Sequence, residues 1–165
     1  MEFVKSQLNP DITDWLKILP FDLNFGNTIY CCHACPVSDS TYLLEEIKSN
    51  QVGIKDNLEI NLLVREINQK IITCGHSHIP RIVETSNKII INPGSVGLPA
   101  YDDDFPAPHK MESFNTHAKY AIVANMRDLL SIDLVSIPYD CESAAISAEK
   151  NKRNDWANWI RKGRA

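Results

Sequence analysis

Long apolar runs, a dominant charge and a regular set of cysteines are all missing from this 165-residue sequence. No apolar stretch approaches the roughly 20 residues that cross a bilayer, and the N-terminal residues do not form the apolar core of a signal peptide. The 17 basic and 21 acidic residues leave a net charge of −4, which gives no electrostatic reason to bind nucleic acid or an anionic membrane. We therefore expect neither a membrane nor a nucleic acid as a partner.

The cysteines number five, an odd count with irregular spacing that argues against a complete disulfide framework. A reducing cytoplasm is the simplest setting for such a chain. Apolar residues make up 44% and charged residues 23% of the sequence, as in an ordinary globular domain. The length suits one domain, residues 1–165, with a substantial buried core.

Apolar residues recur at helical spacing in some segments and alternate as in strands in others. Helices are predicted at residues 9–19, from Asp39 or Ser40 to Ile47, and at 56–67, 142–152 and 155–162. Strands are predicted at 21–25, 28–32, 71–74, 81–84, 88–91, 118–124 and 129–137. Asp56 and Glu59 form a capping box for helix 56–67, whose expected buried side carries Leu58, Leu62, Leu63 and Ile67. Interleaved helices and strands predict a layered α/β domain.

Two histidines, His76 and His78, lie in a loop that follows a short apolar strand and begins with Gly75. Gly75 is expected to let the backbone turn there. A further histidine, His33, also follows an apolar strand, and the carboxyl ends of strands are where open α/β sheets place their sites. Neutral imidazole is a common metal ligand. His33, His76 and His78 are therefore the candidate ligands, whereas His109 and His117 are predicted to be solvated.

The cysteines offer a competing metal site. Cys31, Cys32 and Cys35 surround His33, and Cys74 alternates with the two loop histidines. Thiolate and imidazole are the ligands of structural zinc, but such sites take two ligands from each of two knuckles separated by two to four residues. The contiguous Cys31-Cys32-His33 run does not fit that spacing, and free cysteine is often buried.

The segment from Asn92 to about Thr116 is long and irregular, with four prolines and three consecutive aspartates. Loops of this length are often functional or disordered. The segment is either a surface excursion or a lid over the histidine loop. Asp102, Asp103 and Asp104 are candidate replacement ligands, although adjacent carboxylates on such a loop are usually solvated.

Two motifs together carry a family resemblance. Gly75-His76-Ser77-His78, followed by Asn92-Pro93-Gly94-Ser95-Val96-Gly97, resembles the C-terminal motif pair of the calcineurin-like metallophosphoesterases. Cys32-His33-Ala34-Cys35-Pro36 resembles the preceding His-Gly-x-Pro element, and the segments 117–121 and 138–140 and the tail resemble a small bacterial subgroup. The resemblance implies an α/β fold, a partial α/β/β/α sandwich that lacks the N-terminal strands and helices.

The resemblance also implies chemistry. Two divalent metal ions (Mn, Fe, Zn or Ni, which the sequence does not distinguish) would activate a water that attacks a phosphomonoester or phosphodiester. His33 and His76 would bind one ion and His78 the other. The turn that carries Asn92, Gly94 and Ser95 would lie along the substrate.

The carboxylate ligands of that family are missing from the sequence. No Asp-x-His, metal-bridging Gly-Asp or Gly-Asn-His-Asp motif occurs, so the catalytic residues are expected in an N-terminal half outside this chain. Imidazoles alone do not offset the repulsion between two divalent cations. We expect the chain to be inactive by itself and to expose sheet edge and apolar surface.

Three interpretations remain open at this point. The chain is the C-terminal portion of a phosphoesterase with a misassigned start or a split gene, a truncated metal-binding or regulatory module that dimerises, or a structural zinc protein. The expected partners are a phosphate ester and either a second copy or a separate N-terminal half.

Overall fold

A five-stranded mixed sheet forms the centre of the computed structural model, which describes residues 4, 7–126 and 129–165. Its strands, in spatial order, are β1 (Asp22–Phe25), β2 (Ile29–Cys32), β5 (Ile71–Thr73), β7 (Ile89–Asn92) and β6 (Arg81–Glu84). The three central strands β2, β5 and β7 run parallel, and the two edge strands are antiparallel to their neighbours. The carboxyl ends of the central strands therefore meet at one edge of the sheet.

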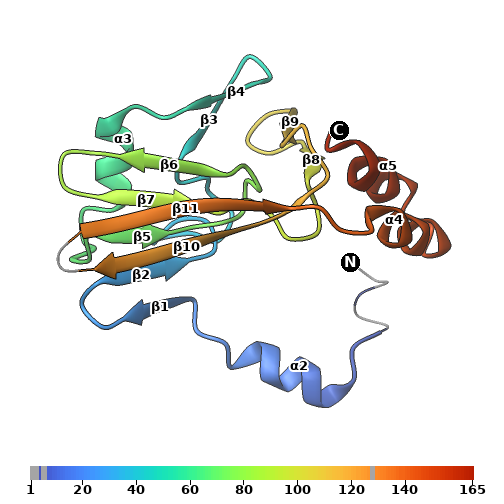
Figure 1. Ribbon diagram of the computed structural model, residues 1–165, viewed down its shortest axis with the longest axis horizontal. Helices are drawn as coiled ribbons and strands as arrows, with labels where there is room; N and C mark the ends of the chain where they lie inside the picture. Colours follow the sequence, from blue (N-terminus) through green and yellow to red (C-terminus); the bar gives the residue numbers. More distant parts are fainter. Residues whose placement is uncertain (1–3, 5–6, 127–128) are drawn as a thin grey trace.

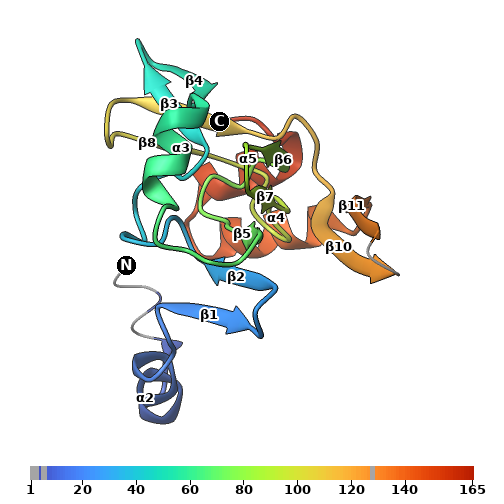
Figure 2. The same ribbon diagram turned by 90° about the vertical axis from the view of Figure 1, so that its left-hand side faces the viewer.

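The remaining elements surround this sheet. Three hairpins are formed by β3 (Glu45–Lys48) with β4 (Gln51–Ile54), β8 (Ala100–Asp103) with β9 (His109–Glu112), and β10 (Ala118–Met126) with β11 (Leu129–Ile137). Helix α3 (Asn57–Leu63) lies on one side of the sheet and the β10–β11 hairpin on the other (Figure 2). Helices α4 (Cys141–Lys150) and α5 (Asn154–Lys162) pack together at one end of the molecule (Figure 1). The α/β sandwich implied by the resemblance is confirmed.

The main core lies between the sheet and α3. Its buried members come from the central strands, from α3 and from the segment before β3: Tyr30, Cys35, Leu43, Leu44, Ile60, Val64, Ile72, Cys74 and Ile90. Burying such side chains stabilises the fold by about 1.5–3 kcal/mol each. This core fixes the strand ends from which the histidine loops emerge.

Several predicted boundaries are confirmed by their hydrogen bonds. Asn9 caps helix α2 (Pro10–Lys17), because its Oδ1 accepts a hydrogen bond from Ile12 N at 2.8 Å. Asp56 caps α3 in the same way through Glu59 N, also at 2.8 Å. The predicted hairpin between β6 and β7 is present in the register Val83 to Ile90.

One helix prediction is wrong, and a second is wrong in part. No helix begins at Asp39 or Ser40, because Leu43 and Leu44 pack into the core as irregular chain and the strand β3 follows. Helix α3 is shorter than predicted, and its buried face is only partly the predicted one: Leu63 and Ile67 pack against the core, but Leu58 and Leu62 are exposed and Ile60 is fully buried instead. Apolar residues occur on both sides of this segment, and the set 60, 63, 64 and 67 fits the helical repeat as well as the predicted set.

The segment from Asn92 to Thr116 is not a loose excursion. It contains the β8–β9 hairpin, in which Ala100 and Met111 are completely buried. This hairpin lies beside the end of the sheet that carries the histidine loops, as Tyr101 Oη donates a hydrogen bond to His76 O at 2.9 Å.

The expected exposed edge and apolar surface are present. Strand β1 is an edge strand, and its Leu23 and Phe25 are 46% and 58% exposed. Helix α2 buries none of its residues and stands apart from the sheet beyond β1 (Figures 1 and 2). Within the described part of the chain, none of the helices has the length and apolar character to cross a membrane.

Candidate functional site

The ends of the three parallel strands bring the predicted motifs together. His33 follows β2, the loop Gly75 to His78 follows β5, and Asn92 ends β7. Gly75 N donates a hydrogen bond to His33 O at 2.7 Å, which ties the first two loops directly. A Cβ on Gly75 would lie 3.4 Å from His33 O, an ordinary van der Waals distance, so this contact does not itself require glycine.

His33 and His76 form the centre of the candidate site. Their ring centroids are 5.2 Å apart and their planes are inclined at 62°. His76 Nε2 lies 3.2 Å from Ser40 O, and since a carbonyl oxygen only accepts, this contact places the proton on Nε2 and leaves Nδ1 with a lone pair. Burial, with His33 as the second cause, lowers the pKa of His76 and favours the neutral form that binds metals.

His78 occupies a separate position. Its Nδ1 lies 2.8 Å from Leu98 O, which by the same reasoning leaves Nε2 with a lone pair, a common arrangement for a metal-binding histidine. Burial lowers the pKa of His78. Its ring packs edge-on against Tyr101 at 5.1 Å.

The backbone of the loop is strained at both histidines. His76 has a φ of 61° and His78 a φ of 60°, a left-handed conformation that costs about 1–3 kcal/mol for each non-glycine residue. Ser77 N donates to Gly75 O at 2.7 Å, which closes a γ-turn on His76. The expectation that Gly75 makes the turn is therefore wrong, because the left-handed positions are those of the two histidines.

A buried polar network holds this strained loop. Ser77 and Asn92 are completely buried, and Asn92 Nδ2 donates to Gly75 O at 2.7 Å and to Ser77 Oγ at 2.9 Å. The Ser77 hydroxyl also hydrogen-bonds the carboxyl group of Glu45, to which Arg81 Nε donates at 3.1 Å. Burial raises the pKa of Glu45, and Ser77 and Arg81 oppose that rise.

The turn after β7 packs closely against its surroundings. Gly94 has a φ of 89°, and a Cβ there would lie 2.9 Å from Lys119 Cδ and 3.3 Å from Pro80 Cδ. Ser95 Oγ accepts a hydrogen bond from Leu98 N at 3.0 Å, and Gly94 N donates to Asn92 Oδ1 at 2.9 Å. Asn92 and Ser95 therefore shape the turn, and the predicted substrate contact of Asn92, Gly94 and Ser95 stays a prediction.

Three residues near the site were not assigned to it from the sequence: Tyr42, Tyr101 and His109. Tyr42 stacks on His76 with ring centroids 4.6 Å apart, and its hydroxyl contacts both Tyr101 and His109. His109 is only 4% exposed, so the prediction that it is solvated is wrong. The alternation of His109 and Met111 with Lys110 and Glu112 was the strand signal that could have placed it. His117, also predicted to be solvated, is half-buried, with its Nδ1 3.2 Å from Ser136 Oγ.

The other candidate ligands do not join the histidines. Asp102, Asp103 and Asp104 are exposed at the end of β8. Cysteines Cys31, Cys32, Cys35, Cys74 and Cys141 are free thiols. Burial raises the pKa of Cys32 to about 12 and that of Cys74 well above its ordinary value, which disfavours the thiolate that binds zinc.

The donors of this chain therefore do not fit a two-metal centre. Among the described residues, no group of three or more His, Cys, Asp or Glu side chains is arranged to hold a metal ion. His33 and His76 provide two neighbouring imidazoles, but neither a third ligand nor a carboxylate between two cations accompanies them there. The role of His33, His76 and His78 as metal ligands therefore stays a prediction.

Comparison with known proteins identifies the fold. No protein-family model and no curated protein matches this sequence. The solved structure of hypothetical protein PH1004 from Pyrococcus horikoshii OT3 has a TM-score of 0.70 at 15% identity, over 96% of this chain and 56% of that chain. A metallophosphoesterase from Sphaerobacter thermophilus has a TM-score of 0.70 at 16% identity, over 96% of this chain and 64% of that chain.

The chain thus spans less than two thirds of either of these two structures. The similarity identifies the fold of this chain as a partial metallophosphoesterase-like fold.

Proposed function

We propose that this chain is the histidine-bearing part of a metal-dependent phosphoesterase that hydrolyses phosphomonoesters or phosphodiesters. The observation that supports the proposal most is the meeting of His33 and His76 at the ends of the parallel strands β2 and β5. Both are placed on the strand ends of a metallophosphoesterase-like fold, where ligands are expected.

The proposal assigns the carboxylate ligands to a different stretch of polypeptide. A two-metal site stabilises the attacking and the leaving oxygen with ions 3.5–4 Å apart in general, and anionic ligands reduce the repulsion between those ions. We expect these carboxylate ligands to come from a polypeptide that corresponds to the part of the two similar structures that this chain does not span. Exposed Leu23 and Phe25 on the edge strand β1 provide apolar surface for that polypeptide.

The first experiment measures hydrolysis of p-nitrophenyl phosphate and bis-p-nitrophenyl phosphate by the purified chain with added Mn²⁺. We expect no turnover above the Mn²⁺ background, because the chain lacks a third ligand beside His33 and His76. Turnover that disappears in His76→Ala but persists in His117→Ala would show that the chain is a complete enzyme and contradict the proposed division.

A genetic test addresses the missing part directly. The DNA immediately upstream of the Met1 codon is sequenced and translated in all three frames. We expect Asp-x-His and Gly-Asn-His-Asp motifs there or in an adjacent gene, and their absence would favour the second candidate function.

The second candidate is a non-catalytic metal-binding or regulatory module that covers its exposed edge by dimerisation. The absence of a three-ligand group among the described residues favours it over a self-sufficient enzyme. A dimer of constant mass in analytical ultracentrifugation, with no upstream ligand motifs, would support this alternative. The cytoplasmic setting stays a prediction under either function.

Metal analysis separates both candidates from the structural zinc interpretation. We expect the purified chain to lack stoichiometric zinc, since burial disfavours the thiolates of Cys32 and Cys74. Stoichiometric zinc that is lost in Cys32→Ser but kept in His76→Ala would instead support a structural zinc site.

A further inference from the structure

A cavity of about 650 Å³ is lined in part by the residues that follow His78, and the candidate site does not use it. Its other walls come from β4 and β9 and from the residues next to these strands. Strands β4 and β9 lie next to each other (Figure 1). Ligand pockets in proteins generally have volumes of about 300–1,000 Å³. Among the described residues that line this cavity, none is a histidine, so the cavity is separate from the candidate metal ligands.

Charged side chains of both signs line the cavity. Arg81 and Lys110 are the cations, and Glu112 is the carboxylate. Lys110 Nζ donates a hydrogen bond to Ala165 O at 2.6 Å, which uses one of the three donors of an ammonium group. Glu112 Oε1 accepts a hydrogen bond from Ala165 N at 3.0 Å. The backbone of Ala165 thus engages each of these two side chains once, and Lys110 keeps donors for a ligand.

Arg81 is held in place by a buried partner. Its Nε donates to Glu45 Oε1 at 3.1 Å, and the Glu45 and Arg81 side chains are 2% and 24% exposed. Nη1 and Nη2 form no hydrogen bond with the described residues. A guanidinium group can bind two oxygens of one phosphate or carboxylate group, and a side chain that is already fixed loses little freedom when a ligand binds. Arg81 therefore provides a preorganised group for an oxyanion.

Glu45 offsets the charge of Arg81 only in part. The Glu45 carboxylate also interacts electrostatically with Lys55, whose Nζ donates a hydrogen bond to the backbone oxygen of Glu45. One buried carboxylate is therefore shared between two cations. Since Glu45 does not cancel the charge of Arg81 completely, the guanidinium group keeps an attraction for an anion in the cavity.

Part of the cavity wall is apolar. Val52, Pro80 and Phe114 line it, and Phe114 is 63% exposed. An exposed aromatic ring provides a large contact area for an apolar or aromatic group. Arg164 lies over this ring, with its Cζ 5.1 Å from the ring centroid, and brings a further cation to the edge of the cavity. The wall thus suits a ligand that is anionic at one end and apolar at the other.

We propose that this cavity binds a small amphipathic anion, in which a phosphate, phosphonate or carboxylate group is attached to an apolar group. Arg81 and Lys110 bind the oxyanion, and Val52, Pro80 and Phe114 contact the apolar part. The inference is independent of the proposed function, because it requires neither a metal ion nor any of the three candidate histidine ligands.

Binding is tested with phenylphosphonate, which resists hydrolysis, in ¹H–¹⁵N correlation spectra of the full chain with EDTA to remove metal ions. We expect saturable shifts of the backbone amides of Val52, Arg81 and Phe114. Benzyl alcohol lacks the anion and methylphosphonate lacks the ring. Each should bind at least about 10-fold more weakly than phenylphosphonate, as for the loss of a charge-assisted hydrogen bond or of a buried apolar group. No saturable shift at millimolar concentration, or shifts confined to the histidine loop, would overturn the proposal.

The same titrations test the two ends of the ligand separately. Equal affinities for phenylphosphonate and benzyl alcohol would overturn the oxyanion contact, and equal affinities for phenylphosphonate and methylphosphonate would overturn the apolar contact. Benzoate, which carries a carboxylate on the same ring, is titrated in parallel. The tighter of phenylphosphonate and benzoate identifies the oxyanion that the cavity prefers.

The role of Arg81 is tested by a conservative substitution. Arg81→Lys keeps a cation beside Glu45 but removes the guanidinium fork, and it should weaken phenylphosphonate binding by about 10-fold. Arg65→Lys, at a side chain that is 68% exposed and does not line the cavity, is the matched control and should leave the affinity unchanged. Equal affinities of the two variants would overturn the role of Arg81.

A second variant leaves the buried pair of Arg81 and Glu45 intact. Lys110→Gln, at an exposed residue, should weaken phenylphosphonate binding by about 3-fold, as for other exposed charges. Lys17→Gln, at a side chain that is 69% exposed on α2, is its control. If neither Arg81→Lys nor Lys110→Gln weakens binding, the proposal fails. That failure leaves the proposed function untouched, because the proposed function is tested with Mn²⁺ and phosphate esters.

Discussion

At the scale of single residues, the shape of the candidate site depends on a serine and a glycine that are not candidate metal ligands. Ser77 lies between the two histidines, completely buried, and connects Asn92 to Glu45. Gly94 allows the turn after β7 to pass Lys119 and Pro80 at close range. The strained loop that carries His76 is held by the buried hydrogen bonds of Asn92 to Gly75 O and Ser77 Oγ.

Ser77→Ala should lower the free energy of unfolding by about 1–3 kcal/mol, because Asn92 and Glu45 would each lose a buried hydrogen-bond partner. Urea denaturation followed by circular dichroism measures the change. Ser86→Ala, in the exposed turn before β7, is the control and should change stability by less than about 0.5 kcal/mol. A loss no larger than that of the control would show that the network does not support the loop.

Gly94→Ala should destabilise the fold for two reasons, a left-handed backbone and a steric clash. The same substitution at Gly26 measures the first reason alone. The left-handed φ alone costs an L-residue about 1–2 kcal/mol, and this cost applies also to Gly26, which has a φ of 55° and no atom within 4 Å of an added Cβ. At Gly94 the Cβ would also clash with Lys119. We expect Gly94→Ala to be the more destabilising variant in thermal denaturation, and equal losses would argue that Lys119 moves aside.

Burial lowers the pKa of His78, which makes its contribution to stability pH-dependent. Below about 6.5 the unfolded chain protonates this histidine, while the folded chain resists protonation until its lower pKa is reached. The unfolded state then binds more protons, so stability falls as the pH decreases through this window. Between pH 7 and pH 5 the unmodified chain should lose more stability than His78→Gln. If urea denaturation shows the free energy of unfolding falling equally with pH in both proteins, the result would contradict this prediction.

At the scale of elements, α3 shows how a short helix can be assigned correctly while its buried face is predicted only in part, since Leu63 and Ile67 pack against the core but Leu58 and Leu62 do not. The Asp56 cap is a local signal, since its carboxylate and Glu59 N are three residues apart, and it was predicted correctly. The buried face depends on where the sheet lies. Ile60, Val64 and Ile67 contact the core, although Leu58 and Leu62 are equally apolar.

The orientation of α3 is tested by two truncations in the same helix. Ile60→Ala should cost about 2–5 kcal/mol, as for other large-to-small changes in a core, because Ile60 is completely buried. Leu58→Ala, at a residue that is 76% exposed, should cost less than about 0.5 kcal/mol. The reverse order in urea denaturation would restore the orientation predicted from the sequence.

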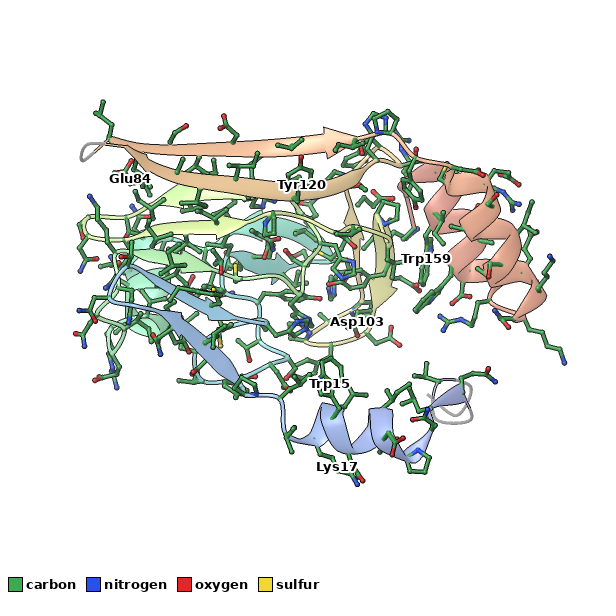
Figure 3. All side chains as sticks on the ribbon, turned by 60° about the horizontal axis from the view of Figure 1, so that its bottom comes forward. Trp15, Lys17, Glu84, Asp103, Tyr120 and Trp159 are labelled. Atoms are coloured by element: carbon green, nitrogen blue, oxygen red, sulfur yellow. The ribbon has the colours of Figure 1, made fainter. Side chains whose placement is uncertain are left out.

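At the scale of the whole molecule, apolar surface on α2 and β1 has no cover within the described chain. Trp15 and Leu19 are 57% and 46% exposed, and Figure 3 shows Trp15 on α2, beside the body of the molecule. Exposed apolar patches of this kind usually mark interaction sites. This surface agrees with a chain that spans only part of the fold of its structural neighbours.

Trp15→Glu combined with Leu19→Glu should reduce binding of the apolar dye ANS and any concentration-dependent association, with little loss of folding stability, because Trp15 on α2 and Leu19 just after it are both exposed. Lys17→Glu, at a side chain that is 69% exposed on the same helix, is the charge control. Light scattering and dye fluorescence measure the outcome. A large loss of stability in the double variant would show that α2 packs on the chain after all.

The sequence by itself determined what depends on neighbouring residues and on motif chemistry. The caps at Asn9 and Asp56 and the β6–β7 hairpin are all encoded within a few positions, so they were predicted correctly. The resemblance of the His76 and Asn92 motifs to the metallophosphoesterases also led to the correct fold.

Only the tertiary structure decided which residues surround those motifs. Tyr42, Tyr101 and His109 are separated by up to 67 positions in the sequence, and the packing of the β8–β9 hairpin against the end of the sheet brings them to His76. The same packing buries Ser77 with Asn92 and leaves the three aspartates outside. Such contacts depend on how distant elements pack, and local propensity and spacing do not specify them.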